Sequence, residues 1–520
     1  MPASGTPDTS TALSDRINPK QPPDTSTALS VRRKPARQAN TSNAPQPDTE
    51  RSRSVRILAI AITLASSLFT QDLAFYDPAA QANDTVAAPD SPVTITIQPD
   101  KELLTIPPLF YGLNQTILPA AFAFRNRELV RRLKPDVIRI FTQKLTLWTR
   151  IDGKAKREDF VLSPKKGDYN WKQIEDHVQG IIDCGAKPYV ALGFGAPPWL
   201  YAGGSERLIR PSHERLSEYA EYMADIVRHL VVDRQYPVQY VTVDNEPENV
   251  KYPIDDYIEL VHLAKASIQK AAPSVKVGGP VTGYATWEQP DGKKLSFSSS
   301  SRYLKDKETP LDFIDWHVYA TAPSVIMRTA AAVKDIYSPQ TEMILSELNR
   351  DWRYATAKDQ ATAISNNAGW DSVAWLVYLY DHLQRAGVSQ VHYFDLNSNP
   401  FGLMNYDNTL VRPNYFTFWA CTSLLGRKRV AADSSSPAAG VIATRNGASI
   451  TALIYNRASS DIAVDIKGIT AASMIVFSSA WFETNKAITN NSLTMPVWEN
   501  TPAANVPAGG FIVVRTDAQK

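Results

Sequence analysis

The stretch Val238-Gln239-Tyr240-Val241-Thr242-Val243-Asp244-Asn245-Glu246-Pro247 decides how the chain folds. Its first six residues alternate and are rich in β-branched side chains, which predicts a strand. The apolar residues stop at Asp244, and Pro247 ends the strand because proline cannot donate to a sheet ladder. A helical pattern over residues 215–232 precedes it. The stretch therefore predicts a helix followed by a strand whose carboxyl end carries polar side chains.

The same alternation of helix and strand repeats on both sides of this stretch. Helical patterns cover residues 126–133, 171–184, 212–232, 255–272, 325–336 and 360–386, and strands are predicted at 109–112, 137–141, 188–193, 238–243, 275–279, 313–317, 343–346 and 390–394. Eight strands that alternate with helices predict an α/β fold with a (β/α)8 TIM barrel over residues 107–426. A doubly wound open sheet is the alternative, but no glycine-rich phosphate loop follows any of the strands.

The pattern changes after residue 426, where short strands replace the helices. They are predicted at residues 441–444, 449–455, 462–466, 473–477 and 511–515, with turns rich in Gly, Asn and Ser between them. Such spacing predicts a C-terminal antiparallel β-sandwich domain over residues 427–520. An early strand at residues 93–97, inside a linker segment 83–106, is expected to join this sandwich.

The amino-terminal part has the composition of a leader. Residues 1–54 are rich in Pro, Ser, Thr and Arg, and they repeat one octapeptide at 7–14 and 23–30, which predicts disorder. Residues 55–82 combine a basic flank, an apolar run and an Ala-x-Ala-like site, as in a signal peptide. The run is shorter than the roughly 20 residues that span a bilayer, so membrane contact is expected only if the segment stays uncleaved. Either way we expect a secreted or periplasmic protein.

Composition narrows the function classes. A formal net charge of +2 disfavours a nucleic-acid partner. The two cysteines, Cys184 and Cys421, are far apart in sequence, and no His/Asp cluster has metal spacing, so we predict no disulfide framework, no metal and no cofactor. The 11 Trp and 22 Tyr residues suit sugar-binding surfaces, although most of them are expected in the core. Nothing in the sequence indicates an oligomeric state.

Two glutamates end predicted strands on opposite sides of the barrel. Glu246 ends the fourth strand and Glu347 ends the seventh, whereas Arg139 lies near the end of the second and is expected beside Glu347. Active sites of TIM barrels lie at the carboxyl ends of the strands. Glycoside hydrolysis needs one carboxylic acid and one carboxylate, and a separation of about 5–5.5 Å means retention of configuration. The pair therefore predicts a glycosidase site.

Three motifs give a family resemblance. The sequences Asn245-Glu246-Pro247, Trp316-His317-Val318-Tyr319 and Ser346-Glu347-Leu348-Asn349 resemble the clan A retaining glycoside hydrolases. The segments 401–405, 412–415 and 424–426 resemble glycoside hydrolase family 39 within that clan. The resemblance covers residues 107–426. Family 39 often has an aromatic residue before Asn-Glu-Pro, whereas this chain has Asp244.

The resemblance implies a role for each motif residue. Glu246 would be the acid/base, Glu347 the nucleophile, and Asn245 the hydrogen-bond partner of the sugar 2-hydroxyl. His317 and Tyr319 would line the site, with Tyr319 bonded to the nucleophile.

Side chains outside the motifs complete the prediction. Trp199 and Trp352 follow strands and are candidates for stacking on sugars, whereas Glu248 is expected to be a solvated neighbour. The sequence thus predicts a retaining glycosidase acting on a polysaccharide or oligosaccharide, such as an exopolysaccharide. The alternatives are a non-hydrolytic carbohydrate-binding envelope protein and a membrane-tethered scaffold.

Overall fold

The structure is a computed structural model that describes residues 86–115, 120–146, 156–159, 161–193, 195–201, 210–283, 286–353, 357–398, 400–500 and 505–516. All of them belong to one compact unit, Leu64–Lys520. The predicted disordered region 1–54 and the predicted signal segment 55–82 lie outside the described residues. Within the described ranges, no helix combines the length and the apolar character needed to cross a membrane.

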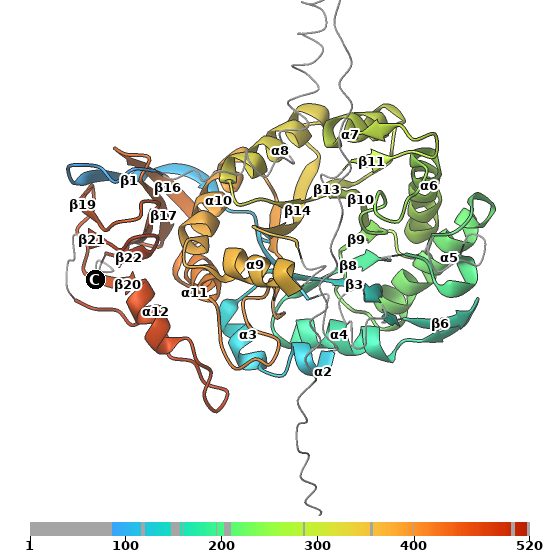
Figure 1. The fold of residues 1–520 in the computed structure, drawn as a ribbon, viewed down its shortest axis with the longest axis horizontal. Helices are drawn as coiled ribbons and strands as arrows, with labels where there is room; N and C mark the ends of the chain where they lie inside the picture. Colours follow the sequence, from blue (N-terminus) through green and yellow to red (C-terminus); the bar gives the residue numbers. More distant parts are fainter. Residues whose placement is uncertain are drawn as a thin grey trace, which may run out of the picture. The chain divides into compact units, whose positions relative to one another are not determined.

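Eight parallel strands close into the predicted barrel (Figure 1). They are β2 (Tyr111–Asn114), β3 (Val137–Phe141), β8 (Lys187–Leu192), β9 (Tyr240–Val243), β10 (Lys276–Thr282), β13 (Phe313–Tyr319), β14 (Glu342–Asn349) and β15 (Gln390–Tyr393). Each strand pairs with the next one in this order, and β15 pairs with β2 to close the barrel. The predicted fold class is confirmed.

The barrel interior changes from apolar to polar along the strands. Side chains at every second position of a barrel strand point inward. A small apolar cluster near the amino ends contains Val137, Tyr189, Tyr240, Phe313 and Ile344. The positions two residues further along β3, β13 and β14 are polar, and this alternation carries hydrogen-bonding groups up to the mouth of the barrel.

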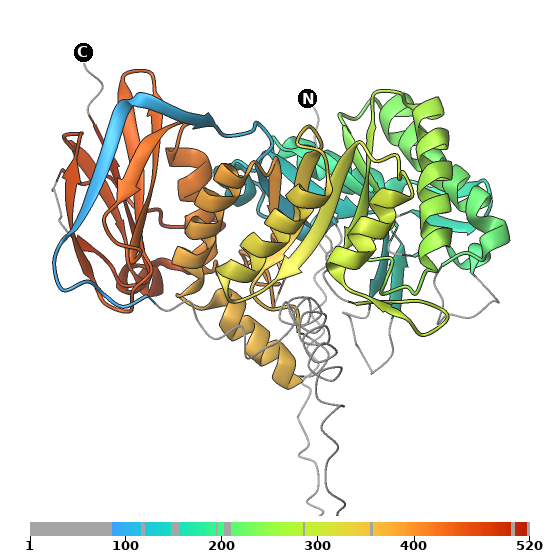
Figure 2. The same ribbon diagram turned by 90° about the horizontal axis from the view of Figure 1, so that it is seen from above.

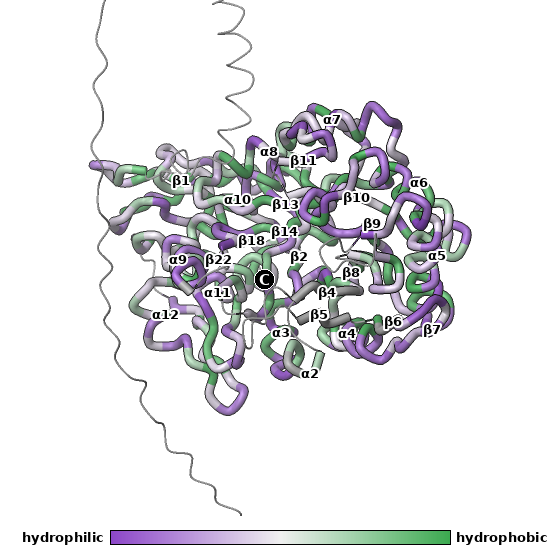
Figure 3. Tube along the Cα trace, turned by 45° about the vertical axis from the view of Figure 1, so that its right-hand side comes forward, coloured by the Kyte–Doolittle hydropathy of each residue, from purple (hydrophilic) through white to green (hydrophobic). Residues whose placement is uncertain are grey.

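Helices surround the barrel (Figures 1 and 2). They include α3 (Arg127–Leu133), α4 (Lys172–Asp183), α5 (Leu216–Val227) with the π-helical turn η4 (Arg228–Asp233), α6 (Ile254–Ala271), α8 (Pro323–Ile336) and α11 (Pro413–Trp419). Along outer helices such as α6 the chain alternates between hydrophilic and hydrophobic residues (Figure 3). Each helix therefore buries one apolar face against the strands.

Two segments differ from the sequence prediction. The single helix expected at 360–386 is divided into α9 (Ala357–Ala368) and α10 (Ser372–Ala386). A Cβ on Gly369 would lie 2.5 Å from the Ser365 carbonyl oxygen, so the chain turns where only glycine fits. The break replaces one long helix by a bent pair.

The region 286–308, for which the sequence predicts no helix or strand, contains regular secondary structure. It holds a hairpin of β11 (Trp287–Glu288) and β12 (Lys294–Leu295), followed by α7 (Phe297–Asp306). The Ser296 side chain accepts a hydrogen bond from the Ser299 amide and begins the helix. Serine is a weak helix former, so the run of serines obscured this helix in the sequence.

The second sheet has eight strands in the order β20-β22-β18-β17-β16-β1-β19-β21. They are β1 (Val93–Thr105), β16 (Lys428–Ser434), β17 (Ala439–Asn446), β18 (Ser449–Asn456), β19 (Ile462–Lys467), β20 (Ser473–Phe477), β21 (Asn505–Val506) and β22 (Phe511–Arg515). A short helix, α12 (Ser479–Asn485), follows β20. The pairs are antiparallel except for β1 with β19, which is parallel.

This sheet buries both of its faces. Along β18, Ile450, Ala452 and Ile454 enter the core of the sheet domain, whereas Leu453 and Tyr455 enter the core of the barrel. The strict alternation of a strand thus joins two cores through one sheet. β1 lies before the barrel in sequence and pairs with β16 after it (Figure 2), so the barrel is inserted between two neighbouring strands of the sheet.

Candidate active site

The turn after β9 presents Glu246 in a strained backbone conformation. Asp244 and Glu246 have φ angles of 60° and 45°. The Glu246 amide donates to the Val281 carbonyl oxygen at 3.0 Å, and Val281 itself has a φ of 57°. Left-handed backbone is unfavourable for non-glycine residues, and most of all for β-branched ones. Such strain is concentrated at functional sites, where the surrounding structure enforces it.

Asp244 is the anchor of this turn. Its side chain is fully buried and accepts hydrogen bonds from the amides of Gly195 at 3.0 Å and Asn245 at 2.8 Å. Its other oxygen accepts from the hydroxyls of Tyr252 at 3.0 Å and Tyr219 at 3.4 Å. Burial raises the pKa of Asp244, and these hydrogen bonds oppose the rise. The residue that departs from the family pattern therefore holds Asn245 and Glu246 in place, a role that the sequence analysis missed.

Glu347, at the end of β14, is buried and bonded on both oxygens. Arg139 Nη1 donates to Oε1 at 2.8 Å, and the Tyr319 hydroxyl donates to Oε2 at 2.5 Å. Arg139 also donates to Asn114 Oδ1 at 3.1 Å and to Asn245 Oδ1 at 2.6 Å. One buried guanidinium thus connects the ends of three strands and orients both Glu347 and Asn245.

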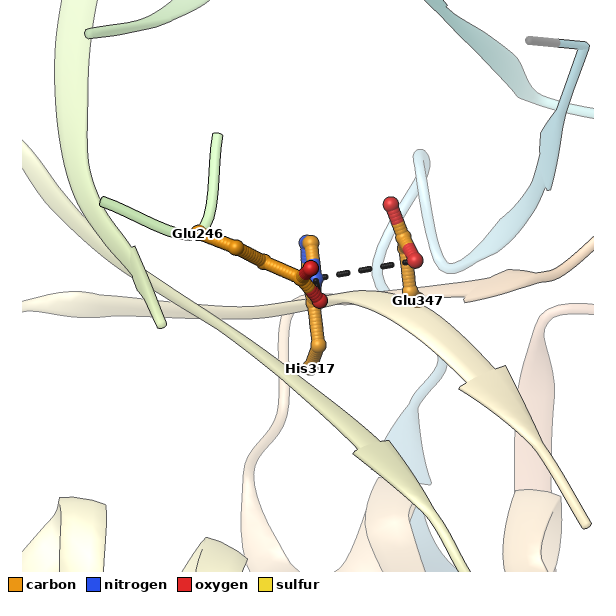
Figure 4. Close-up of side chains that lie close together, drawn as sticks. All are labelled: Glu246, His317 and Glu347. Carbon is orange, nitrogen blue, oxygen red and sulfur yellow. Dashed lines mark hydrogen bonds and ion pairs between the residues drawn. The ribbon is translucent and has the colours of Figure 1, made fainter. Parts of the chain in front are cut away.

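The two glutamates lie close together across the site (Figure 4). One oxygen of Glu246, one oxygen of Glu347 and a ring nitrogen of His317 lie within 4.8 Å of one another. His317 Nδ1 is 2.9 Å from Glu246 Oε1 and 3.6 Å from Glu347 Oε2. Inverting glycosidases separate their carboxyl groups by about 6.5–9.5 Å and retaining ones by about 5–5.5 Å. The spacing fits retention.

The environment of Glu246 favours its protonated form. Burial raises the pKa of Glu246, although a hydrogen bond from Asn249 at 2.7 Å and the charge of Arg139 oppose the rise. A raised pKa is what a general acid near neutral pH requires.

Glu248 was expected to be solvated, and that prediction is wrong. Its side chain is only 7% exposed, because it turns inward beside Gly283. A Cβ on Gly283 would lie 3.2 Å from Glu248 Oε1 and 3.3 Å from Glu246 Oε1. Burial and the neighbouring charge of Glu246 raise the pKa of Glu248 well above its ordinary value. A second carboxyl group therefore lies beside Glu246, in space that a glycine leaves open.

His317 is neutral in this site. Burial lowers the pKa of His317 to about 3. The charge of Glu347 opposes this shift, and the smaller influence of Arg139 adds to it. Its second nitrogen, Nε2, is 3.1 Å from Ser346 Oγ.

Glu246, His317 and Glu347 also have the spacing of a possible metal site. The Arg139 guanidinium already neutralises Glu347 at 2.8 Å and would repel a cation placed there.

The two tryptophans that were predicted to stack on sugars lie in different environments. Trp199 is half-buried on the loop after β8, where its indole N–H donates to Ser163 Oγ at 3.1 Å and Arg215 lies 5.6 Å from its ring. Trp352 follows β14 and is 46% exposed. Trp352 therefore has a free ring surface near the strand that carries Glu347, whereas Trp199 is embedded in side-chain contacts.

The fold and the site together resemble those of the clan A retaining glycoside hydrolases. The family model "Glycosyl hydrolases family 39" matches residues 152–368, which confirms the resemblance to that family. No curated protein matches the chain closely enough to count as a relative.

Solved structures share the fold. A monomeric β-xylosidase from Caulobacter crescentus CB15 is 15% identical, with a TM-score of 0.57, and the match covers 82% of this chain and 100% of that one. A family 39 enzyme from Xanthomonas axonopodis pv. citri is 16% identical, with a TM-score of 0.55 and coverage of 83% and 97%. An α-L-arabinofuranosidase from Thermotoga maritima is 14% identical, with a TM-score of 0.56 and coverage of 82% and 100%.

Proposed function

We propose that this glycosidase cleaves an oligosaccharide or polysaccharide by double displacement, with Glu347 as nucleophile and Glu246 as acid/base. The observation that carries the proposal is the short spacing of two carboxyl groups in unlike environments. Glu347 is bonded to a cation and a hydroxyl, which stabilise its anion, whereas burial favours the protonated form of Glu246. Two such carboxyl groups divide the roles of nucleophile and general acid.

The reaction proceeds in two balanced steps. In the first, a Glu347 oxygen forms a bond to the anomeric carbon while the glycosidic bond breaks and Glu246 gives its proton to the leaving oxygen. In the second, ionised Glu246 takes a proton from water, the water oxygen attacks the anomeric carbon, and the bond to Glu347 breaks. Asn245, held by Arg139 at 2.6 Å, is positioned for the 2-hydroxyl of the sugar.

The substrate class follows from the leader and from the neighbours in fold. The basic and apolar segment at 55–82 supports export, so we place the enzyme in the periplasm or outside the cell. Its substrate is then a glycan that occurs there, and an exopolysaccharide fits. The similar structures are named as a β-xylosidase, an endoxylanase, a glucosidase and an arabinofuranosidase, which defines the sugars to test first.

Trapping the covalent intermediate tests this function. The enzyme is incubated with activated 2-deoxy-2-fluoro glycosides of xylose, glucose and arabinose, and with oligosaccharides released from bacterial exopolysaccharides. Mass spectrometry is expected to find one sugar attached to the peptide that contains Glu347, and Glu347→Gln is expected to remain unlabelled. Azide is expected to restore turnover of Glu246→Ala by replacing the water and its base.

The same experiment examines the non-hydrolytic alternative. A carbohydrate-binding protein would bind glycans with no labelling and no turnover on any member of the panel. That result would reject the double-displacement proposal.

A further inference from the structure

A chain of hydrogen bonds runs from Glu246 down into the barrel. His317 Nδ1 lies 2.9 Å from Glu246 Oε1, and its Nε2 lies 3.1 Å from Ser346 Oγ. The Ser346 hydroxyl donates to Asp315 Oδ1, and the Tyr189 hydroxyl donates to Asp315 Oδ2. Asp315 and His317 are two residues apart on β13, so both point inward, and Ser346 projects from the neighbouring strand β14.

All four side chains below Glu246 are sealed from solvent. His317, Ser346, Asp315 and Tyr189 each have 0% exposure. Buried polar groups must satisfy one another, because no bulk water can replace a missing partner. The position of every hydrogen in the chain therefore depends on the position of the others.

Counting the hydrogens determines the tautomer of His317. Ser346 has one hydroxyl hydrogen and uses it toward Asp315, so it can only accept from His317. Nε2 must then carry the single N–H of the neutral ring, which leaves a lone pair on Nδ1. A lone pair 2.9 Å from Glu246 Oε1 forms a hydrogen bond only if that oxygen carries a proton.

We propose that Ser346 and Asp315 are positioning residues that hold His317 as the Nε2–H tautomer, so that Nδ1 accepts a hydrogen bond from protonated Glu246. This inference rests on the proposed acid/base role of Glu246. The arrangement keeps Glu246 ready as an acid before the first step. After the proton has left, the Nδ1 lone pair faces a carboxylate, which favours uptake of a proton from water in the second step.

Other charged and titratable groups face the same positions. Those around Glu246 and His317 are Glu347, Arg139, Tyr319, Glu248 and His392, and those around Asp315 are Tyr189, Arg139, Glu347 and Tyr257. The positive charge of Arg139 favours ionised Glu246. The acceptor at Nδ1 opposes that effect, since it stabilises only the protonated form.

Asp315 determines the pH range in which His317 is held as the Nε2–H tautomer. Burial raises the pKa of Asp315 to about 6, against the charge of Arg139 and the bonds from Ser346 and Tyr189. Above that pH the ionised carboxylate holds the Ser346 hydroxyl hydrogen. Below it, a protonated Asp315 can donate to Ser346, whose hydroxyl is then free to turn toward Nε2.

Removing the Ser346 hydroxyl tests whether this side chain fixes the tautomer of His317. In Ser346→Ala the ring of His317 is free to carry its proton on Nδ1 and to donate to ionised Glu246. The pKa of Glu246 then falls, so the alkaline limb of the kcat/KM profile is expected to move to lower pH by about one pH unit. Asp315→Asn is expected to shift the limb in the same direction, because its amide can donate to Ser346 and release the hydroxyl toward Nε2. Ser372→Ala is the control, since it removes another buried serine hydroxyl, bonded to Gly369, without a shift.

Nitrogen NMR gives a readout that does not depend on turnover. With uniformly ¹⁵N-labelled protein, and the His317 signals assigned from their loss in His317→Gln, the wild type at its pH optimum is expected to carry the ring proton on Nε2. Ser346→Ala and Asp315→Asn are expected to move it to Nδ1. A wild-type proton on Nδ1, or an unshifted alkaline limb in both variants, would contradict the proposed positioning role of Ser346 and Asp315. Failure of the fluorosugar labelling would instead reject the proposed function.

Discussion

Among the residues that the structure describes, two arginine–carboxylate pairs are buried to the same extent. Arg139 and Glu347 meet at 2.8 Å at the mouth of the barrel, and Arg429 and Asp381 meet at 2.6 Å between the barrel helix α10 and the second sheet. In both pairs the arginine side chain is 0% exposed and the carboxylate side chain 6%. Burial alone therefore does not distinguish a pair in the proposed active site from a pair at a structural junction.

Their other partners separate the two pairs. Asp381 also binds Arg385 at 2.9 Å and accepts from the Tyr455 hydroxyl at 3.3 Å. Burial raises the pKa of Asp381, but the charges of Arg429 and Arg385 outweigh it and hold the pKa below its ordinary value. Glu347, in contrast, faces a second carboxyl group, that of Glu246, through His317. A charge pair that is fully neutralised stabilises a junction, whereas one that faces another titratable acid can do chemistry.

The largest expected effect comes from removing the carboxylate of Glu347, the proposed nucleophile. Glu347→Gln keeps a side chain of equal size next to Arg139 but cannot attack the anomeric carbon. We expect kcat to fall by a factor on the order of 10⁴ or more, since loss of a nucleophile removes the whole covalent route. Steady-state kinetics on the best substrate of the panel measure this. Residual activity within tenfold of wild type would show that Glu347 is not the nucleophile.

Breaking the Arg429–Asp381 pair should lower stability and leave activity unchanged. Arg429→Met leaves Asp381 buried without its main partner, and breaking a buried pair typically costs about 3–5 kcal/mol. We expect a lower free energy of unfolding in urea, with kcat unchanged at temperatures well below the melting transition. Arg445→Met, which removes an exposed pair with Asp100, is the matched control. A loss of activity in folded Arg429→Met would contradict the division between the two pairs.

The pH dependence of the stability of the fold should show that His317 is neutral in the folded protein. Folded His317 stays unprotonated down to about pH 3, whereas in the unfolded chain it titrates near its ordinary value of 6.5. The unfolded state therefore binds more protons between these values, and stability falls as pH drops below 6.5. His317→Gln is expected to flatten this dependence in thermal melts recorded from pH 7 to pH 4. The same change at exposed His213 serves as comparison, and an unchanged slope in His317→Gln would argue against a buried neutral ring.

Asp244 extends the comparison to a buried carboxyl group whose hydrogen-bond donors are backbone amides and tyrosine hydroxyls in place of an arginine. The donors that the structure gives it are neutral. Asp244→Asn can keep one oxygen for the amides of Gly195 and Asn245, but it replaces the oxygen that accepts from Tyr252 and Tyr219 by an amide donor. We expect kcat to fall by about tenfold with KM nearly unchanged, because Glu246 loses its fixed position. Kinetics combined with urea unfolding separate this from a general loss of stability. Full activity in the variant would show that the turn holds Glu246 without Asp244.

The sequence predicts the parts of this molecule that depend on local pattern. The alternation of helices and strands predicts the barrel, and the positions of Glu246 and Glu347 at strand ends predict their meeting. Asp315 and Ser346 could not be identified, because each lies inside an ordinary strand and matters only through a neighbour on another strand. Their signal was the spacing of two residues between Asp315 and His317, which places both on the inner face. Glu248 was misjudged because the inward turn of its side chain depends on the distant Gly283.

The placement of β1 has a consequence for how the protein folds during synthesis. The Thr94 amide bonds to the Ser435 hydroxyl across 341 residues of sequence. The ribosome therefore produces the whole barrel before β16 and β19 exist to cover β1. Until then the apolar face of β1, formed by Val93, Ile95 and Ile97, is exposed and its backbone edges are unpaired. Such a strand can pair wrongly with another chain. The sheet is completed only when the last part of the chain returns to its beginning, so loss of the C-terminal strands would leave β1 unprotected even beside a finished barrel.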